Sequence, residues 1–146
     1  MKRRQPEAGR DTGSGRPLLD RLGVKSGMRV GLVGFRDAGF EAELRERGAT
    51  PEVDRARPGL DMLFYMVREP ADLLSLRELA PLIHDGGALR VLRVKGAGLK
   101  VREVDVIEAG KASGLVDNKI ASFSDVHAAM RLVVPLARRG RRERRS

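Results

Sequence analysis

A near-continuous apolar run from Met28 to Phe35 is the clearest pattern along the chain. It contains two glycines and one charged residue, and the segment after it has the spacing of an amphipathic helix over about 39–47. An apolar run that leads directly into a helix is typical of a strand buried on both faces of a parallel sheet. The pattern therefore predicts a first strand at about 28–35, with its functional turn at the carboxyl end.

The same periodicities predict the other elements. Further strands are expected at about 50–54, 60–67, 88–94, 117–123 and 129–136, and further helices over about 17–22, 70–83 and 101–113. Pro51 restricts the second strand to a sheet edge, because proline has no N–H for the ladder. Right-handed crossovers place the first strand between the second and third. The predicted fold is α/β: a three-layer, Rossmann-like, mostly parallel sheet in the order 2-1-3-4-6-5, with the last strands antiparallel.

Spacing within the helices also predicts local contacts. Glu41 and Arg45 stand four residues apart, which favours an ion pair on the exposed face. Val104 and Ile107 are expected to form the buried face of the last helix. His84 is expected near a helix end, where a cation meets the helix dipole favourably.

Composition narrows the chemistry. The 146 residues amount to one domain, and with 41% hydrophobic but only 3% aromatic residues the core must be aliphatic. Cysteine is absent and the histidines are only His84 and His127, which argues against disulfides and histidine-rich metal sites. No catalytic constellation stands out, so no catalytic residue, metal or cofactor is predicted. No apolar leader or membrane-length stretch is present, which indicates a cytoplasmic protein with no membrane contact.

The net charge of +9 is concentrated at the two ends. Residues 1–10 carry four basic residues against one acidic, and residues 138–146 carry six against one. We therefore expect a disordered basic arm over 1–16, a single domain over 17–137 and a disordered tail over 138–146. The tail arginines, which would contact nucleic-acid phosphates weakly and without sequence preference, are Arg138, Arg139, Arg141, Arg142, Arg144 and Arg145. The alternative is a tail that only adds solubility.

Three cations directly follow predicted parallel strands, namely Arg36, Arg68 and Lys95. Because the carboxyl ends of such strands meet at one edge, where ligands bind, these residues form the predicted site for a small anion. Asp37 and Gly96 stand beside them and are included in the site. The alternative is an ionic rim in which neighbouring acids such as Asp37 simply neutralise the cations.

A nucleotide site receives less support. Gly31, Gly34 and Gly39 do not match the G-x-G-x-x-G spacing, and the loop after the first strand is not rich in glycine, so tight binding of S-adenosylmethionine is not expected. Asp54 stands twenty residues after Gly34, about where a ribose-binding acid would lie, or it is an ordinary loop aspartate.

Short motifs spread over most of the chain carry a family resemblance. They are Gly27-Met-Arg-Val30, Gly86-Gly87-Ala-Leu89, Lys95, Gly114-Leu-Val-Asp-Asn-Lys119 and Met130-Arg-Leu-Val133. In this order the chain resembles an uncharacterised bacterial family, the domain of unknown function numbered thirty fifty-two, over about 24–134. The resemblance implies a shortened methyltransferase-type Rossmann fold. Family members have Trp-Pro where this chain has Arg93-Val94, and only Lys95 and Arg131 carry over among the polar positions.

These observations together favour a cytoplasmic Rossmann-like binding module that is not itself a catalyst and that holds a small anionic ligand or a protein partner. One alternative is a methyltransferase-related or nucleotide-using enzyme with an altered pocket. The other is a protein that associates with nucleic acid nonspecifically through its arginine-rich tail.

Overall fold

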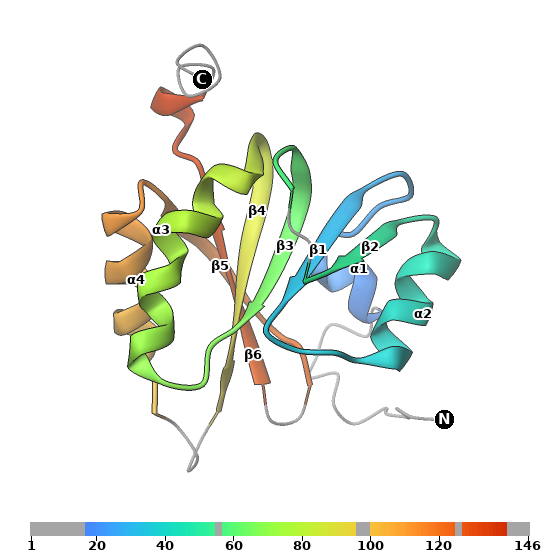
Figure 1. The fold of residues 1–146 in the computed structure, drawn as a ribbon, viewed down its shortest axis with the longest axis horizontal. Coiled ribbons are helices and arrows are strands. Elements are labelled where there is room, and N and C mark those ends of the chain that lie inside the picture. Colours follow the sequence, from blue (N-terminus) through green and yellow to red (C-terminus); the bar gives the residue numbers. More distant parts are fainter. Residues whose placement is uncertain (1–16, 55–56, 96–99, 125–126, 140–146) are drawn as a thin grey trace.

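The computed structural model describes residues 17–54, 57–95, 100–124 and 127–139 (Figure 1). Its six strands are β1 (Arg29–Val33), β2 (Thr50–Val53), β3 (Leu60–Met66), β4 (Ile83–Val94), β5 (Val116–Ser122) and β6 (His127–Val133). They form one sheet in the order β2-β1-β3-β4-β6-β5. The pairs β1–β2, β1–β3 and β3–β4 are parallel, and β6 is antiparallel to both β4 and β5. The predicted topology is confirmed, including the edge position of the strand that contains Pro51.

Helices cover both faces of this sheet (Figure 1). The α-helices are α1 (Leu18–Leu22), α2 (Ala38–Arg47), α3 (Leu76–Leu79) and α4 (Glu103–Ala112), and the 3-10 helices are η2 (Pro70–Ser75), η3 (Ala80–Leu82) and η5 (Leu136–Arg138). α1 and α2 lie on one face, whereas η2, α3 and α4 pack together on the other. The three layers follow from the chain order, because each crossover between parallel strands must pass over a face.

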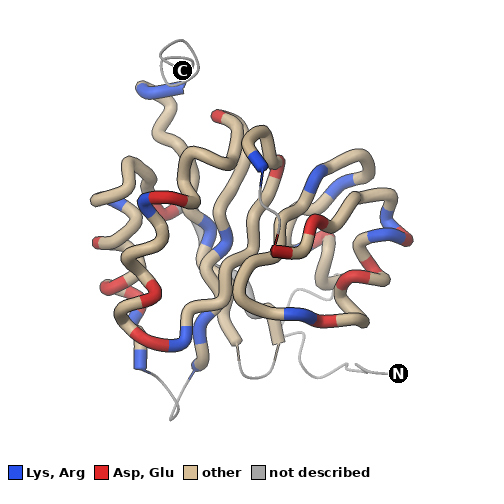
Figure 2. The backbone as a smooth tube through the Cα atoms, in the orientation of Figure 1, with Lys and Arg blue, Asp and Glu red and all other residues tan. Residues whose placement is uncertain are grey.

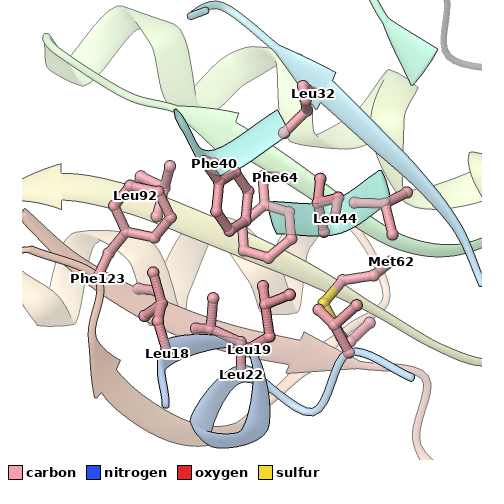
Figure 3. Packing of buried hydrophobic residues seen from close by; sticks show 14 of the residues in the cluster. Leu18, Leu19, Leu22, Leu32, Phe40, Leu44, Met62, Phe64, Leu92 and Phe123 are labelled. Carbon is pink, nitrogen blue, oxygen red and sulfur yellow. The ribbon is translucent and has the colours of Figure 1, made fainter. Parts of the chain in front are cut away.

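The core has one cluster on each face of the sheet, as expected for strands without a solvent-facing side. The cluster under α1 and α2 contains three of the four phenylalanines as buried residues (Figure 3). Phe40 meets Phe64 and Phe123 edge to face, with ring centroids 5.2 and 5.0 Å apart. The opposite cluster is almost wholly aliphatic. The few aromatic residues are therefore used mostly where α2 meets the sheet.

The helical layer over the second cluster differs from the sequence expectation. The helix expected over 70–83, with a kink or restart at Pro81, is a succession of η2, α3 and η3, and the restart at Pro81 is confirmed by the start of η3. In α4 the buried residues are Val106 and Gly110, Ile107 is partly buried against the second cluster, and Val104 is 46% exposed. The helix approaches β6 closely at Gly110, where a Cβ would lie 3.1 Å from a methyl group of Leu132. The expected burial is therefore confirmed for Ile107, which packs against the second cluster, and wrong for Val104.

The start of β4 also differs. We expected the strand to begin at Ala88 after a turn, but pairing with β3 begins at Ile83 and shifts register opposite Asp61. At Gly87 the backbone passes so close to β3 that a Cβ would lie 2.8 Å from the Asp61 carbonyl oxygen. The irregularity carries His84, whose Nε2 lies 2.8 Å from Asp61 Oδ1. His84 thus lies near a helix end as expected, two residues after η3, and its partner is the Asp61 carboxylate on β3.

Candidate functional site

The predicted site lies where β1, β3 and β4 end, at the lower edge of the sheet in Figure 1. Figure 2 shows basic and acidic segments side by side along this edge. Gly34 directly follows β1 and has φ +87°, a conformation that favours glycine. A Cβ at this position would also lie 3.3 Å from the Met66 carbonyl oxygen. The turn after β1 is therefore held close against the end of β3.

Arg36 forms an internal ion pair at this turn. Its Nε and Nη2 donate to the two carboxylate oxygens of Glu41, each at 3.1 Å. The Asp37 backbone N–H donates to the same carboxylate at 3.1 Å, and Glu41 is only 3% exposed. The bond from Arg36 holds the pKa of Glu41 below its ordinary value. The main partner of Glu41 is thus Arg36, and the expected pairing with Arg45 is reduced to a weaker electrostatic contribution.

The start of α2 is capped by its own side chain. Asp37 stands at the N-cap, and its Oδ1 accepts from the Phe40 N–H at 3.0 Å. The carboxylates of Asp37 and Glu41 therefore occupy two of the N–H donors that an external anion could use at this helix terminus.

Arg68 connects the loop after β3 to the loop after β1. Its Nη1 donates to the Gly34 carbonyl oxygen at 2.8 Å. The backbone N–H groups of Arg68 and Glu69 both donate to Asp72 Oδ2, at 2.9 and 3.1 Å. Arg68 is nevertheless exposed, so its guanidinium also faces solvent at the edge.

Lys95 lies beside the start of β6. The antiparallel register pairs Val94 with His127, so the residue that follows β4 lies close to this histidine. Burial, and then the charges of Arg68 and Lys95, lower the pKa of His127. Ser124 Oγ lies 3.3 Å from His127 Nδ1. Arg68 and Lys95 thus gather around a half-buried imidazole, while Arg36 is held by Glu41.

Asp54 lies on the adjacent side of the edge, immediately after β2. It is exposed, has φ +53°, and its backbone N–H donates to the Leu32 carbonyl oxygen at 2.8 Å. Its charge contributes, after the hydrogen bond and charge of Glu41, to raising the pKa of Arg36. The acid therefore stands near the turn after β1.

Several predicted residues lie outside the described part of the chain, namely Gly96, Arg141, Arg142, Arg144 and Arg145. Arg138 ends η5, and Arg139 Nε donates to the Val134 carbonyl oxygen at 2.9 Å. Contact of these arginines with nucleic acid stays a prediction, as do the boundaries of the arm and the tail.

The described segments show neither a metal centre nor a membrane span. No group of three or more histidine or acidic side chains within them is arranged to hold a metal ion. None of their helices combines the length and the apolar character needed to cross a bilayer.

Sequence reasoning missed the arginines inside the central strand. Arg90 and Arg93 of β4 are both buried, on opposite faces of the sheet. Two arginines in the apolar run Ala88–Val94 were the available signal, because a strand covered on both faces rarely contains a charge without a specific role. Arg29 was also missed: its Nε and Nη2 form a two-pronged ion pair with Glu52, at 2.7 and 3.0 Å.

Solved structures share this arrangement of sheet and helices. A SAM-dependent methyltransferase from Aquifex aeolicus matches with TM-score 0.63 and 13% identity, over 81% of this chain and 88% of that one. A TehB-like SAM-dependent methyltransferase from Corynebacterium glutamicum matches with TM-score 0.60 and 12% identity, over 81% and 85%. The fold is that of a methyltransferase-like Rossmann protein.

A third neighbour includes a bound ligand in its description. The O-methyltransferase NcsB1 of neocarzinostatin biosynthesis, in complex with S-adenosyl-L-homocysteine, matches with TM-score 0.54 and 15% identity, over 73% of this chain and 49% of that one. No protein-family model matches the sequence, and no curated protein does. Membership of the family suggested by the sequence motifs therefore stays a prediction.

Proposed function

We propose that this chain is a methyltransferase-related binding protein that holds a small anionic ligand at the carboxyl edge of its sheet and catalyses no reaction there. The supporting observation is the position of Arg68 and Lys95, which follow adjacent parallel strands and both act electrostatically on His127. A phosphate or carboxylate bound between them would interact favourably with two cations at the ligand-binding edge of an open α/β sheet. Arg36, Asp37 and Gly96 flank this position in the sequence.

The same edge is poorly suited to a tightly bound S-adenosylmethionine. In this type of fold the ligand approaches the backbone of the turn after the first strand. Here the Gly34 carbonyl oxygen accepts from Arg68, and the Asp37 N–H donates to Glu41. Both bonds would have to open for a ligand to take their place, which costs binding free energy.

Exchange of Lys95 for Met tests the proposal, because it keeps the apolar stem and removes the charge. Binding of inorganic phosphate and of ATP would be measured by calorimetry at constant ionic strength. We expect Lys95→Met to weaken phosphate binding at least about fivefold, which is roughly 1 kcal/mol, without loss of stability. Lys100→Met is the matched control, since Lys100 is exposed beyond the same loop. Equal affinities in the wild type and the Lys95 variant would overturn the proposal.

A methyltransferase-related enzyme is the second candidate, and the position of Asp54 favours it. An exposed acid directly after β2 is where a Rossmann protein binds the ribose hydroxyls of its ligand. If the chain is such an enzyme, S-adenosylmethionine should bind with micromolar affinity and Asp54→Asn should weaken it. Calorimetry with this cofactor separates the candidates, since the leading proposal expects no tight binding in either protein.

A further inference from the structure

A pocket of about 340 Å³ opens beside α1, at the amino ends of β3 and β4 and away from the carboxyl edge of the sheet. Leu22, Met28 and Met62 form apolar wall, and Figure 3 shows Leu22 and Met62 in the layer between α1 and the sheet. Arg90 and Arg131 also line the pocket, from β4 and β6. This volume lies near the lower end of the range for small-molecule sites, roughly 300–1,000 Å³.

Arg90 is the unusual residue of this pocket. It is 2% exposed, and its Nη2 donates to the Leu22 carbonyl oxygen at 2.9 Å, at the carboxyl end of α1. Its Nε and Nη1 are buried and have no hydrogen-bond partner among the described residues. A guanidinium has five N–H donors, and buried donors are almost always satisfied. The hydrogen bond to the end of α1 therefore accounts for Nη2 only and leaves the burial of Nε and Nη1 unexplained.

Arg131 adds a second cation to the same face. It is directly opposite Arg90 in the β4–β6 register. Burial, and then the charge of Arg131, lower the pKa of Arg90 to about 10. Two like charges near one pocket repel, so a ligand that relieves the repulsion must be negatively charged.

The acids that line the pocket have partners elsewhere. Asp61 receives the Arg29 backbone N–H at 2.8 Å and pairs with His84. Asp20 pairs with Arg47 at 2.9 Å. The remaining charged lining residues are Arg21 and Lys25, so the lining has four cations and two acids.

We propose that this pocket binds a small organic anion, a phosphate monoester or a carboxylate with a short apolar body, through Arg90 and Arg131. The anionic group would contact the guanidinium of Arg90, whose Nε and Nη1 lack partners among the described residues, and the apolar body would contact Leu22 and Met62. Guanidinium groups suit this task because their planar fork matches phosphate and carboxylate oxygens. The site lies at the opposite end of β4 from Lys95, so it does not depend on the function proposed above.

The Nε–Hε resonance of Arg90 tests this directly by NMR on the full chain, assigned by its loss in Arg90→Lys. The probes are phenyl phosphate, benzoate and inorganic phosphate, added at constant ionic strength. We expect a saturable shift with phenyl phosphate or benzoate, and binding several-fold weaker with inorganic phosphate, which has no apolar body. The relative affinities of phenyl phosphate and benzoate show which anionic group the pocket prefers. A resonance that none of the three probes moves would overturn the proposal.

Substitutions distinguish ligand binding in this pocket from ligand binding at the carboxyl edge. Arg131→Gln should weaken the phenyl phosphate or benzoate response of Arg90 about tenfold, whereas Lys95→Met should leave it unchanged. Lys25→Gln at the rim supplies the comparison if Arg131→Gln does not fold, and we expect about threefold weakening from it. The proposal would be overturned if Lys95→Met weakened the ligand-induced shift of the Arg90 resonance while Arg131→Gln and Lys25→Gln did not. The ligand would then bind at the carboxyl edge.

Discussion

The two basic regions of this molecule satisfy their charges differently. At the carboxyl edge of the sheet, Arg36 pairs with Glu41 and Arg68 donates to Gly34. In the pocket beside α1, Arg90 has two buried nitrogens without a partner among the described residues. The edge that the sequence marks as functional is therefore the better satisfied of the two. Position at the end of a strand identifies where a ligand site is located in this fold, but unmet hydrogen bonds identify where the folded chain still needs a partner.

The largest effect on stability should come from replacing Glu41, whose buried carboxylate pairs with Arg36 at the carboxyl edge. Glu41→Gln should lower the free energy of unfolding by about 2 kcal/mol, because the buried carboxylate accepts three hydrogen bonds and an amide cannot replace it fully. Urea denaturation measures the change. Glu46→Gln, at an exposed position of the same helix, should change it by less than about 0.5 kcal/mol. Similar losses in both variants would show that the carboxyl edge is not held by this pair.

The same carboxylate should make stability depend on pH. The pKa of Glu41 in the folded protein lies below its ordinary value of 4.5. Its contribution is therefore complete above pH 4.5 and disappears as the pH falls through the folded pKa, since the unfolded chain takes up the proton more readily. Denaturation of the wild type and of Glu41→Gln between about pH 3 and 6 should show the difference in unfolding free energy shrinking toward acid. A difference that is constant over this range would contradict the ion pair.

Replacing Arg90, the buried cation beside α1, should have the opposite effect on stability. Arg90→Met should raise the free energy of unfolding by about 1 kcal/mol in the absence of anions, because an incompletely paired buried charge is replaced by an apolar side chain of similar length. Thermal denaturation in chloride buffer is the measurement, and Arg77→Met on the surface should be neutral. A loss of about 2 kcal/mol or more would mean that Arg90 is already well satisfied, and the contrast between the two regions would disappear.

The smallest effect concerns the electrostatic influence of Arg68 on His127. Arg68→Met should raise the pKa of His127 toward its ordinary value, because burial remains but one of the two nearby charges is removed. An NMR titration of the imidazole follows this change. Arg77→Met is again the control, and a His127 pKa that is unaltered in both variants would separate Arg68 from the predicted site.

Much of the architecture was predictable from local pattern. The apolar runs at β1, β3 and β4 and the Pro51 edge signal led to the strand order that the structure shows. The burial faces of short helices were less predictable. In α4 the buried Gly110 lies close to Leu132, which belongs to β6, more than twenty residues later in the chain. Periodicity in one segment carries no information about such a partner.

The site was predictable only as a list of residue types at strand ends. That Arg36, Arg68 and Lys95 follow β1, β3 and β4 could be read from the chain. Which carboxylate each cation meets could not, because Arg36 selects Glu41 through the turn that Gly34 permits. The partner of Arg90 is still harder to predict from the sequence, because Leu22 lies 68 residues away along the chain.

The sequence by itself determined the order of strands and helices, since hydrophobic periodicity and the handedness of crossovers are local properties of the chain. Only the tertiary structure decided which charges are satisfied internally and which remain open. The pairing of β4 with β6 brings Arg90 opposite Arg131, and Arg90 is buried where it bonds to the end of α1. Desolvation and hydrogen bonding act over distances in space, so charges at separate places in the chain become one site only after folding.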